Sequence, residues 1–144
     1  MKYSKKGLSL TEGFEKLRLA AYQDSGGVWT IGYGHTHCVY PGMTCTKDQA
    51  EAWLLSDMTD AENTVNHMVK VPLTQGEYDA LVDLVFNIGS GNLHGSTVLA
   101  LLNAGNYKDA ALHIEDWDKC KGQELVGLLR RRLAEEDEFI EGMA

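Results

Sequence analysis

The sequence predicts an α+β fold that is mostly helical, in which a small lobe with a β-hairpin is joined by one long helix to a helical lobe. Two patterns lead to this prediction: one Gly-rich turn between extended segments near the N-terminus, and helical spacing of apolar residues from Thr46 onward. The chain has 144 residues, of which 44% are hydrophobic, enough for one core. We expect one two-lobed domain over residues 1–144, with an N-terminal lobe at about 1–45, a connecting helix at about 46–70 and a C-terminal lobe at about 71–144.

The first helix is predicted at about residues 9–19. Ser9 and Glu12 have the spacing of a capping box, in which the serine caps the helix and the glutamate reaches back to it. Apolar residues then recur three and four positions apart. Glu15 therefore falls in the second half of this helix.

A β-hairpin is predicted over residues 22–34, and it is the only convincing β-structure in the sequence. Its Ser-Gly-Gly turn separates segments rich in aromatic and β-branched residues. Gly32 and Gly34 indicate tight backbone bends or a close approach to another group.

The remaining chain is predicted to be helical. Thr46 with Gln49, and Thr74 with Glu77, form two further capping boxes ahead of apolar helical faces. Glycines break the second of these helices at about residue 89. Further helices are predicted at about residues 96–102, 108–118 and 125–140. A cleft between the lobes is the natural place for a ligand.

The charge pattern excludes nucleic acid as the main partner, because 21 acidic residues against 13 Lys and Arg give a net charge of -8. Arg130, Arg131 and Arg132 do form a basic run, but four acids follow at 135–138. We interpret this segment as a solvated helix with opposite charges three and four residues apart, rather than as an anion site.

No apolar stretch approaches the roughly 20 residues that cross a bilayer, so we expect no membrane insertion. The basic N-terminus is not followed by the apolar segment of an export signal. We therefore expect the protein to accumulate in the cytoplasm of the cell that makes it.

The three cysteines allow at most one intrachain disulfide. Cys38 and Cys45 flank a Pro-Gly turn signal, which brings the flanking residues together. We expect them to form a bridge once the protein leaves the reducing cytoplasm, with Cys120 left over.

Glu15 and Asp24 are the candidates for acid–base chemistry. Glu15 lies toward a helix C-terminus, where the negative end of the dipole favours the protonated acid. Asp24 lies at a Gly-rich turn, where backbone N–H groups and water favour the carboxylate. Thr30, on the returning strand, is placed to help hold a water. Spacing alone does not select these acids, and Glu12 is equally eligible by composition.

Several motifs carry a resemblance to a known family. Residues 15–36 read EKLRLAAYQDSGGVWTIGYGHT, which resembles the Glu-x8-Asp-x5-Thr and Ile-Gly-x-Gly-His signature of the T-even phage lysozymes, glycoside hydrolase family 24. The resemblance continues in order along the chain with LTQGEYDAL at 73–81, FNIG at 86–89, LNAG at 102–105, Trp117 and GLLRRR at 127–132.

The resemblance implies a lysozyme-like fold and a phage or prophage endolysin. It implies inverting hydrolysis of the β-1,4 bond between N-acetylmuramic acid and N-acetylglucosamine in peptidoglycan glycan strands, without a cofactor or metal. Glu15 would be the general acid, while Asp24 and Thr30 would position the attacking water. The family usually has glycine after the catalytic glutamate, whereas this chain has Lys16; the Glu-Gly dipeptide occurs instead at Glu12, but only Glu15 has the spacing to both partners.

The same resemblance places four further residues along the sugar cleft: Thr36, Phe86, Asn87 and Thr97. It makes His35 a structural residue that ties the hairpin to the lobe interface. It also implies release of the enzyme from the host cytoplasm to the wall by a separate holin. We expect the enzyme itself to be a monomer.

Three other functions fit parts of the sequence. A zinc-binding module is suggested by His35, His37, Cys38 and Cys45, although their spacing is not that of a standard finger. A wall-binding module without activity would be expected to lack one of the three active-site residues. A lytic transglycosylase also cleaves the glycan with a glutamate, but it does so without water, so Asp24 and Thr30 favour hydrolysis.

Overall fold

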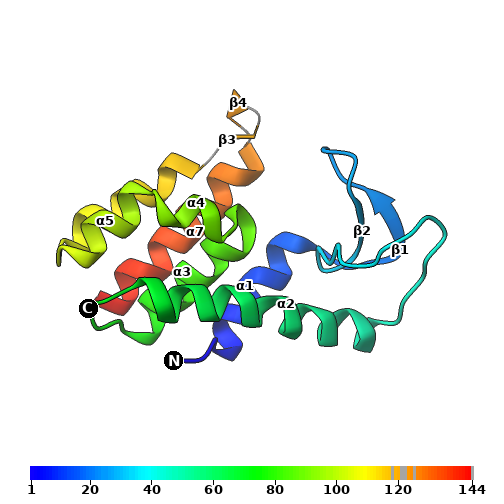
Figure 1. Ribbon diagram of the computed structural model, residues 1–144, viewed down its shortest axis with the longest axis horizontal. Helices are drawn as coiled ribbons and strands as arrows, with labels where there is room; N and C mark the ends of the chain where they lie inside the picture. The colour runs from blue at the N-terminus through cyan, green and yellow to red at the C-terminus, as the bar shows by residue number, and fades with distance from the viewer. Residues whose placement is uncertain (118, 121–122, 125, 144) are drawn as a thin grey trace.

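The computed structural model describes residues 1–117, 119–120, 123–124 and 126–143. The predicted fold class is confirmed: the chain is mostly helical, with a small antiparallel hairpin. Figure 1 shows the hairpin and one end of the long helix α2 (Lys47–Met68) on one side, and the other helices packed together on the opposite side. Within the described residues, no helix has the length and apolar character needed to span a membrane.

Helix α1 (Lys5–Glu15) begins earlier than predicted. Ser4, not Ser9, is its N-cap, and the Ser4 hydroxyl accepts a hydrogen bond from the backbone N–H of Gly7. The Ser4 hydroxyl itself donates to Asp79 of the C-terminal lobe. A partner 75 residues away therefore fixes this helix start, and the local capping-box pattern was misleading.

The predicted hairpin is confirmed as strands β1 (Arg18–Gln23) and β2 (Trp29–Gly32), but β1 begins earlier than predicted, at residues that were expected to end the first helix. They are antiparallel, with Tyr22 opposite Thr30 and an irregularity closer to the start of β1. The other edge of β1 is hydrogen-bonded to the segment that leads into α2. The Cys45 backbone N–H donates to the Leu19 carbonyl at 2.9 Å.

The two capping boxes at Thr46 and Thr74 are confirmed and begin helices α2 and α3 (Gln75–Ile88). Gly89 ends α3 with a φ of 90°, but a short helix follows it directly. The helices of the C-terminal lobe after α3 are α4 (Ser90–His94), α5 (Thr97–Asn103), α6 (Tyr107–His113), the 3₁₀ helix η1 (Ile114–Trp117) and α7 (Val126–Met143).

A second short hairpin was not predicted. Strands β3 (Lys119–Cys120) and β4 (Gln123–Glu124) pair antiparallel just before α7. These strands are too short to show a period-2 pattern, so no sequence pattern predicts them. Residues 118 and 125, at the ends of two predicted helices, lie outside the described residues.

The core lies around α3, whose side chains are buried on most of its circumference. Helix α7 packs closely against it at two glycines. A Cβ atom placed on Gly76 would lie 2.8 Å from the Glu138 carbonyl oxygen, and one placed on Gly142 would lie 2.8 Å from the Glu77 backbone nitrogen. The two glycines thus bring α3 and α7 into backbone contact.

The interpretation of α7 as a solvated charged helix is wrong. Arg131 and Arg132 are 4% and 0% exposed, and Glu135 and Glu136 are buried as well. The charges do pair at helical spacing, since the Arg132 Nε lies 2.7 Å from Glu135 Oε1. They pair inside the lobe because α7 packs against several elements at once, among them α3, η1 and α6.

Cys38 and Cys45 are both free thiols in the structure, so the bridge that we expect outside the cytoplasm is not formed here. Cys38 is exposed and Cys45 is partly covered, and burial raises the pKa of the Cys45 thiol. The side chain of Cys120 lies outside the described part of the structure.

The buried carboxyl of Glu136 makes the stability of the fold depend on pH. Burial, and then the neighbouring carboxyl of Glu115, raise the pKa of Glu136 from 4.5 to about 7. The folded protein thus keeps a proton that the unfolded chain releases, and the free energy of unfolding falls as the pH rises through this interval. Glu136→Gln removes the penalty, so its melting temperature should exceed that of the wild type at about pH 8 but not at about pH 4.

Thermal unfolding followed by circular dichroism at both pH values measures this difference. Asp60→Asn on the exposed face of α2 is the matched control, because it removes one negative charge without a buried carboxyl. An equal gain from both variants would assign the effect to net charge instead of to Glu136.

Candidate active site

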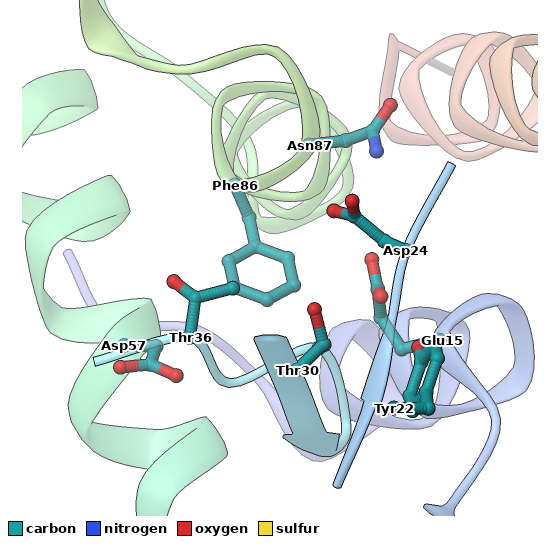
Figure 2. Close-up of a pocket in the computed structure, with 9 residues that line it drawn as sticks. Glu15, Tyr22, Asp24, Thr30, Thr36, Asp57, Phe86 and Asn87 are labelled. Carbon is teal, nitrogen blue, oxygen red and sulfur yellow. The ribbon is translucent and has the colours of Figure 1, made fainter. Parts of the chain in front are cut away.

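A cleft of about 410 Å³ lies where the hairpin, α1, α2 and α3 meet (Figure 2). Six of the seven residues predicted to form the catalytic and sugar-binding site line it. Thr97 does not; it is exposed at the first residue of α5. The lining residues are Glu15, Tyr22, Asp24, Thr30, Gly34, Thr36, Asp57, Phe86 and Asn87.

Glu15 is the last residue of α1, and its side chain is 19% exposed. The helix ends there because Lys16 adopts a left-handed φ of 47° and turns the chain toward β1. The Arg131 Nη1 donates to Glu15 Oε1 at 2.6 Å, which fixes one carboxylate oxygen. The other oxygen faces the backbone of Gly34, where a Cβ atom would lie only 2.5 Å from Oε2.

Asp24 lies at the mouth of the turn between β1 and β2. Its Oδ1 accepts two backbone hydrogen bonds, from Gly26 N–H at 2.8 Å and from Val28 N–H at 2.9 Å. Two donors on one oxygen fix the carboxylate in place. Figure 2 shows this carboxylate directed into the cleft near Glu15.

Thr30 lies on β2, opposite Tyr22 of β1. Its backbone is buried, while its hydroxyl reaches the cleft and donates to the Val28 carbonyl at 2.9 Å. Because the hydroxyl proton is used in this bond, the oxygen presents its lone pairs as acceptors. Thr30 can therefore accept a hydrogen bond from a molecule in the cleft.

The opposite wall of the cleft contains Phe86 and Asn87 from the end of α3 and Asp57 from α2. Asp57 is joined to the hairpin side by His35, whose Nδ1 lies 2.8 Å from Asp57 Oδ2. The His35 ring also stacks on Trp53, with centroids 4.7 Å apart. His35 thus holds the hairpin lobe against α2, in the structural role implied by the resemblance.

These contacts do not support the zinc-binding alternative. One ring nitrogen of His35 bonds Asp57, and the ring is packed against Trp53. Among the described residues, no group of three or more His, Cys, Asp and Glu side chains is arranged to hold a metal ion.

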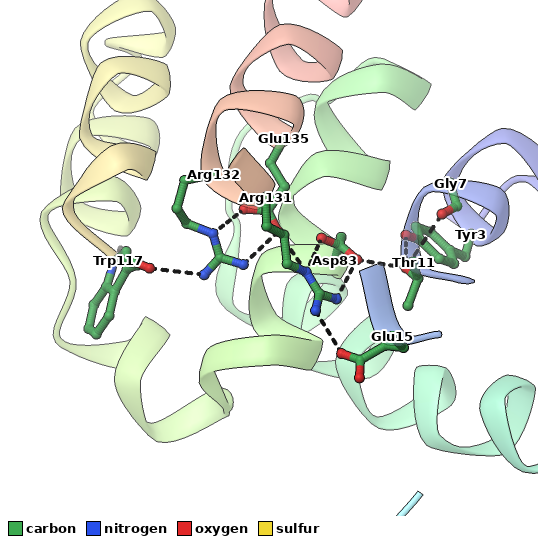
Figure 3. Close-up of polar contacts among 9 residues, drawn as sticks. All are labelled: Tyr3, Gly7, Thr11, Glu15, Asp83, Trp117, Arg131, Arg132 and Glu135. Carbon is green, nitrogen blue, oxygen red and sulfur yellow. Dashed lines mark hydrogen bonds and ion pairs between the residues drawn. The ribbon is translucent and has the colours of Figure 1, made fainter. Parts of the chain in front are cut away.

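Arg131 is the main functional residue that sequence reasoning missed, together with Asp57 and Tyr22. The acids that follow the arginine run led to the prediction of a solvated surface helix. In the structure Arg131 is 4% exposed and bonds Asp83 twice, Nε to Oδ2 at 3.0 Å and Nη2 to Oδ1 at 2.8 Å (Figure 3). Its third bond is the one to Glu15.

The pKa directions follow from this arrangement. Burial alone would raise the pKa of Asp83, but a hydrogen bond with Glu135 and the charge of Arg131 outweigh burial and lower it to about 2. Burial and then the hydrogen bond with Asp83 raise the pKa of Glu135 well above 4.5. Despite its burial, the pKa of Arg131 is raised, chiefly by Asp83. Arg131 and Asp83 are therefore a permanently charged pair.

Comparison with known proteins assigns this chain to a family. Residues 12–135 match the family described as phage lysozyme. The chain is 46% identical over 143 residues to the endolysin of Acyrthosiphon pisum secondary endosymbiont phage 1, covering 96% of this chain and 98% of that protein. It is 41% identical over 137 residues to the endolysin of Salmonella phage P22, covering 92% and 94%.

A solved structure leads to the same group. The muramidase domain of SpmX from Asticaccaulis excentricus superposes with a TM-score of 0.90 at 39% identity, covering 96% of this chain and 97% of that one. The chain therefore belongs to the phage lysozyme family, as a glycoside hydrolase of the endolysin type that acts on peptidoglycan.

Proposed function

We propose that the cleft hydrolyses the β-1,4 bond between N-acetylmuramic acid and N-acetylglucosamine, with Glu15 as general acid and Asp24 as general base. The observation that carries this proposal is the meeting of Glu15, Asp24 and Thr30 in one cleft, with two carboxyl groups in different environments. Glycoside hydrolysis requires such a pair, one carboxyl to protonate the leaving oxygen and one to act on the opposite face.

The surroundings of Glu15 support its role as the acid. Glu15 is the last residue of α1, its side chain is largely covered, and it lines the cleft. Arg131 bonds one of its carboxyl oxygens, and Asp83 offsets part of the positive charge of Arg131. As the glycosidic C–O bond breaks, Glu15 transfers its proton to the leaving oxygen.

Asp24 and Thr30 support the role of holding the attacking water. The two backbone N–H groups on its Oδ1 hold the Asp24 carboxylate in place, and it can take a proton from a water in the cleft. The Thr30 oxygen can accept the other hydrogen bond of that water. The water oxygen then bonds the anomeric carbon from the face opposite the leaving group, so the configuration is inverted.

Thr36, Phe86 and Asn87 are proposed to contact the sugar rings, because all three line the cleft. Phe86 offers an apolar ring face to a sugar, and Asn87 offers both a donor and an acceptor to its amide or hydroxyl groups. Asp57 extends this polar wall, although the resemblance does not single it out.

A lytic transglycosylase acting on the same bond is the second candidate. Asp24 and Thr30 support hydrolysis because they provide an anion and an acceptor for a bound water. Mass spectrometry of the digested glycan separates the two reactions, since hydrolysis leaves a reducing end and transglycosylation leaves an anhydro end.

The biological setting is proposed by likeness to phage endolysins. We propose that the enzyme acts as a monomer, is made in the host cytoplasm and reaches the wall through a holin. The assignment to the T-even lysozymes within glycoside hydrolase family 24 is likewise a proposal, supported by the spacing from Glu15 through Asp24 to Thr30. Loss of lysis in cells that produce the enzyme without a holin is the test of the route.

Substitution of the three residues tests the division of labour. Glu15→Gln cannot donate a proton, so hydrolysis of purified peptidoglycan should fall at least roughly 10²-fold, the scale of general acid catalysis. Asp24→Asn should also be severe, and Thr30→Ala should cost less because its hydroxyl only orients the water. Turbidity clearing measures the rates, and circular dichroism checks the fold.

Glu12→Gln is the matched control, because it neutralises the other acid of the same helix, three residues before Glu15. A folded Glu15→Gln protein with nearly wild-type activity would falsify the assignment, and Glu12 would be the next residue to examine.

The stereochemistry of the product is a separate prediction. The substrate bond is β-linked, so inversion should give the α anomer as the first reducing end, and proton NMR during the first minutes of digestion observes it directly. Inverting pairs have carboxyl groups separated by about 6.5–9.5 Å, which leaves room for the water. Initial appearance of the β anomer would require a retaining mechanism instead.

Gly34 tests whether the position of the Glu15 carboxylate limits the rate. Its φ is 77°, and a methyl group there would collide with Glu15 Oε2. Gly34→Ala should lower the turnover number by about tenfold or more, because small displacements of catalytic groups are costly. Gly42→Ala is the matched control: its φ is 85°, but nothing lies within 4 Å of the new methyl group.

Both alanine variants carry a similar backbone penalty, of roughly 1 kcal/mol. The melting temperatures should therefore fall together, while the rate falls only in Gly34→Ala. Equal activity in the two variants would show that the Gly34 contact does not position Glu15.

A further inference from the structure

Arg131 binds two carboxylates at once, one in the cleft and one beneath it (Figure 3). Glu15 receives a single bond at 2.6 Å, and Asp83 receives two bonds at 2.8 and 3.0 Å. The bidentate partner is thus Asp83, which is 0% exposed and does not touch the cleft. The guanidinium is held from below and reaches Glu15 with its remaining nitrogen.

The charge on Asp83 is maintained by its other neighbours. Thr11 of α1 donates its hydroxyl to Asp83 Oδ1 at 2.7 Å, and the Tyr3 hydroxyl shares a hydrogen bond with Thr11. A hydrogen bond with Glu135 and the charge of Arg131 outweigh burial and lower the pKa of Asp83 to about 2, so Asp83 is ionised at neutral pH. A negative charge is therefore fixed directly behind the cation that contacts Glu15.

The other groups around Arg131 do not supply a second charge of this kind. Tyr3 is a neutral phenol, because burial and then Asp83 raise its pKa. Glu135 is farther away, with its Oε2 3.9 Å from the Arg131 Nε, and burial and then a hydrogen bond with Asp83 raise its pKa well above 4.5. Phe14 presents only its ring, 5.5 Å from the guanidinium carbon. Arg132 is turned away toward Glu135 and the Trp117 carbonyl.

We propose that Asp83 is a positioning residue of the reaction: by binding Arg131 it offsets part of the charge that this cation presents to Glu15, so that Arg131 holds the acid in place without fully favouring its carboxylate form. The inference rests on the proposed role of Glu15 as the general acid. Arg131 near Glu15 favours loss of the proton, because an opposite charge stabilises the ionised form. Asp83 compensates for that effect in two ways, by partly neutralising Arg131 and by repelling a second negative charge.

Neutralising Asp83 should therefore shift the pH at which Glu15 loses its proton and the rate falls. In Asp83→Asn, both effects of the lost charge favour the Glu15 carboxylate, so Glu15 releases its proton at a lower pH. The alkaline limb of the pH–rate profile should move toward acid by about one pH unit, the usual scale for one nearby charge. The rate lost at neutral pH should be recovered at lower pH, which a merely damaged fold would not show.

Asp79→Asn is the matched control. Asp79 is 1% exposed on the same helix, one turn before Asp83, but its described partners are Ser4 and Gln75. The same change of one buried carboxylate to an amide should leave the alkaline limb in place. Asp83→Ser, which removes the same charge with a smaller side chain, is measured in parallel in case the amide is poorly accommodated.

A second measurement does not depend on activity. The carboxyl carbon of Glu15, assigned by ¹³C NMR through its absence in Glu15→Gln, is titrated in the wild type and in each variant. A lower titration midpoint in the Asp83 variants, together with a matching shift of the rate profile, supports the proposal. An unchanged midpoint overturns it, whatever the rates do.

The two readouts also separate this inference from the proposed function. If the midpoint of Glu15 moves but the alkaline limb does not, Glu15 is coupled to Asp83 but is not the general acid. That result overturns the catalytic assignment and, with it, the positioning role. If Asp79→Asn shifts both readouts equally, the effect belongs to buried charge in α3 generally, and the specific role of Asp83 is refuted.

Discussion

The ion pair between Arg131 and its two carboxylates is the interaction on which the rest of the site depends. It joins α7, α3 and α1, three segments far apart in the chain, at one nearly water-free point. A buried guanidinium is stable only when its charge and its donors are matched. Arg131 therefore requires Asp83 beneath it and Glu15 above it, and its bond to Glu15 fixes the end of α1 at the cleft.

The hairpin side of the cleft is built by a different principle. Asp24 is fixed by bonds to residues two and four positions later in the chain, and Thr30 by a bond to Val28. This geometry is local and follows from the turn itself. The two halves meet where the backbone of Gly34 touches the Glu15 carboxylate, so the lack of a side chain there allows the acid and the water-holding pair to approach.

The same distinction explains what the sequence could and could not predict. The hairpin and the capping boxes at Thr46 and Thr74 are local patterns, and the structure confirms them. The predicted start of α1 was wrong because the N-cap residue Ser4 is held by a hydrogen bond to Asp79, and no local pattern indicates a contact between residues so far apart. The burial of Arg131 was missed because opposite charges at helical spacing look the same on a surface and in a core. Glu15, Asp24 and Thr30 were found only through the resemblance, since their spacing by itself does not distinguish them from other acids.

The proposed acid and the proposed base thus differ in how they are positioned. The Asp24 carboxylate is held by one turn of five residues, whereas the position of the Glu15 carboxyl depends on the packing of three helices around Arg131. Helix α7 reaches that point through close glycine contacts with α3 and by burying four charged side chains. A change that loosens α7 would expose the guanidinium and weaken its bond to Asp83, while the turn at Asp24 would be unaffected. Loosening the C-terminal lobe should therefore disturb the acid before it disturbs the base, even though both face the same cleft.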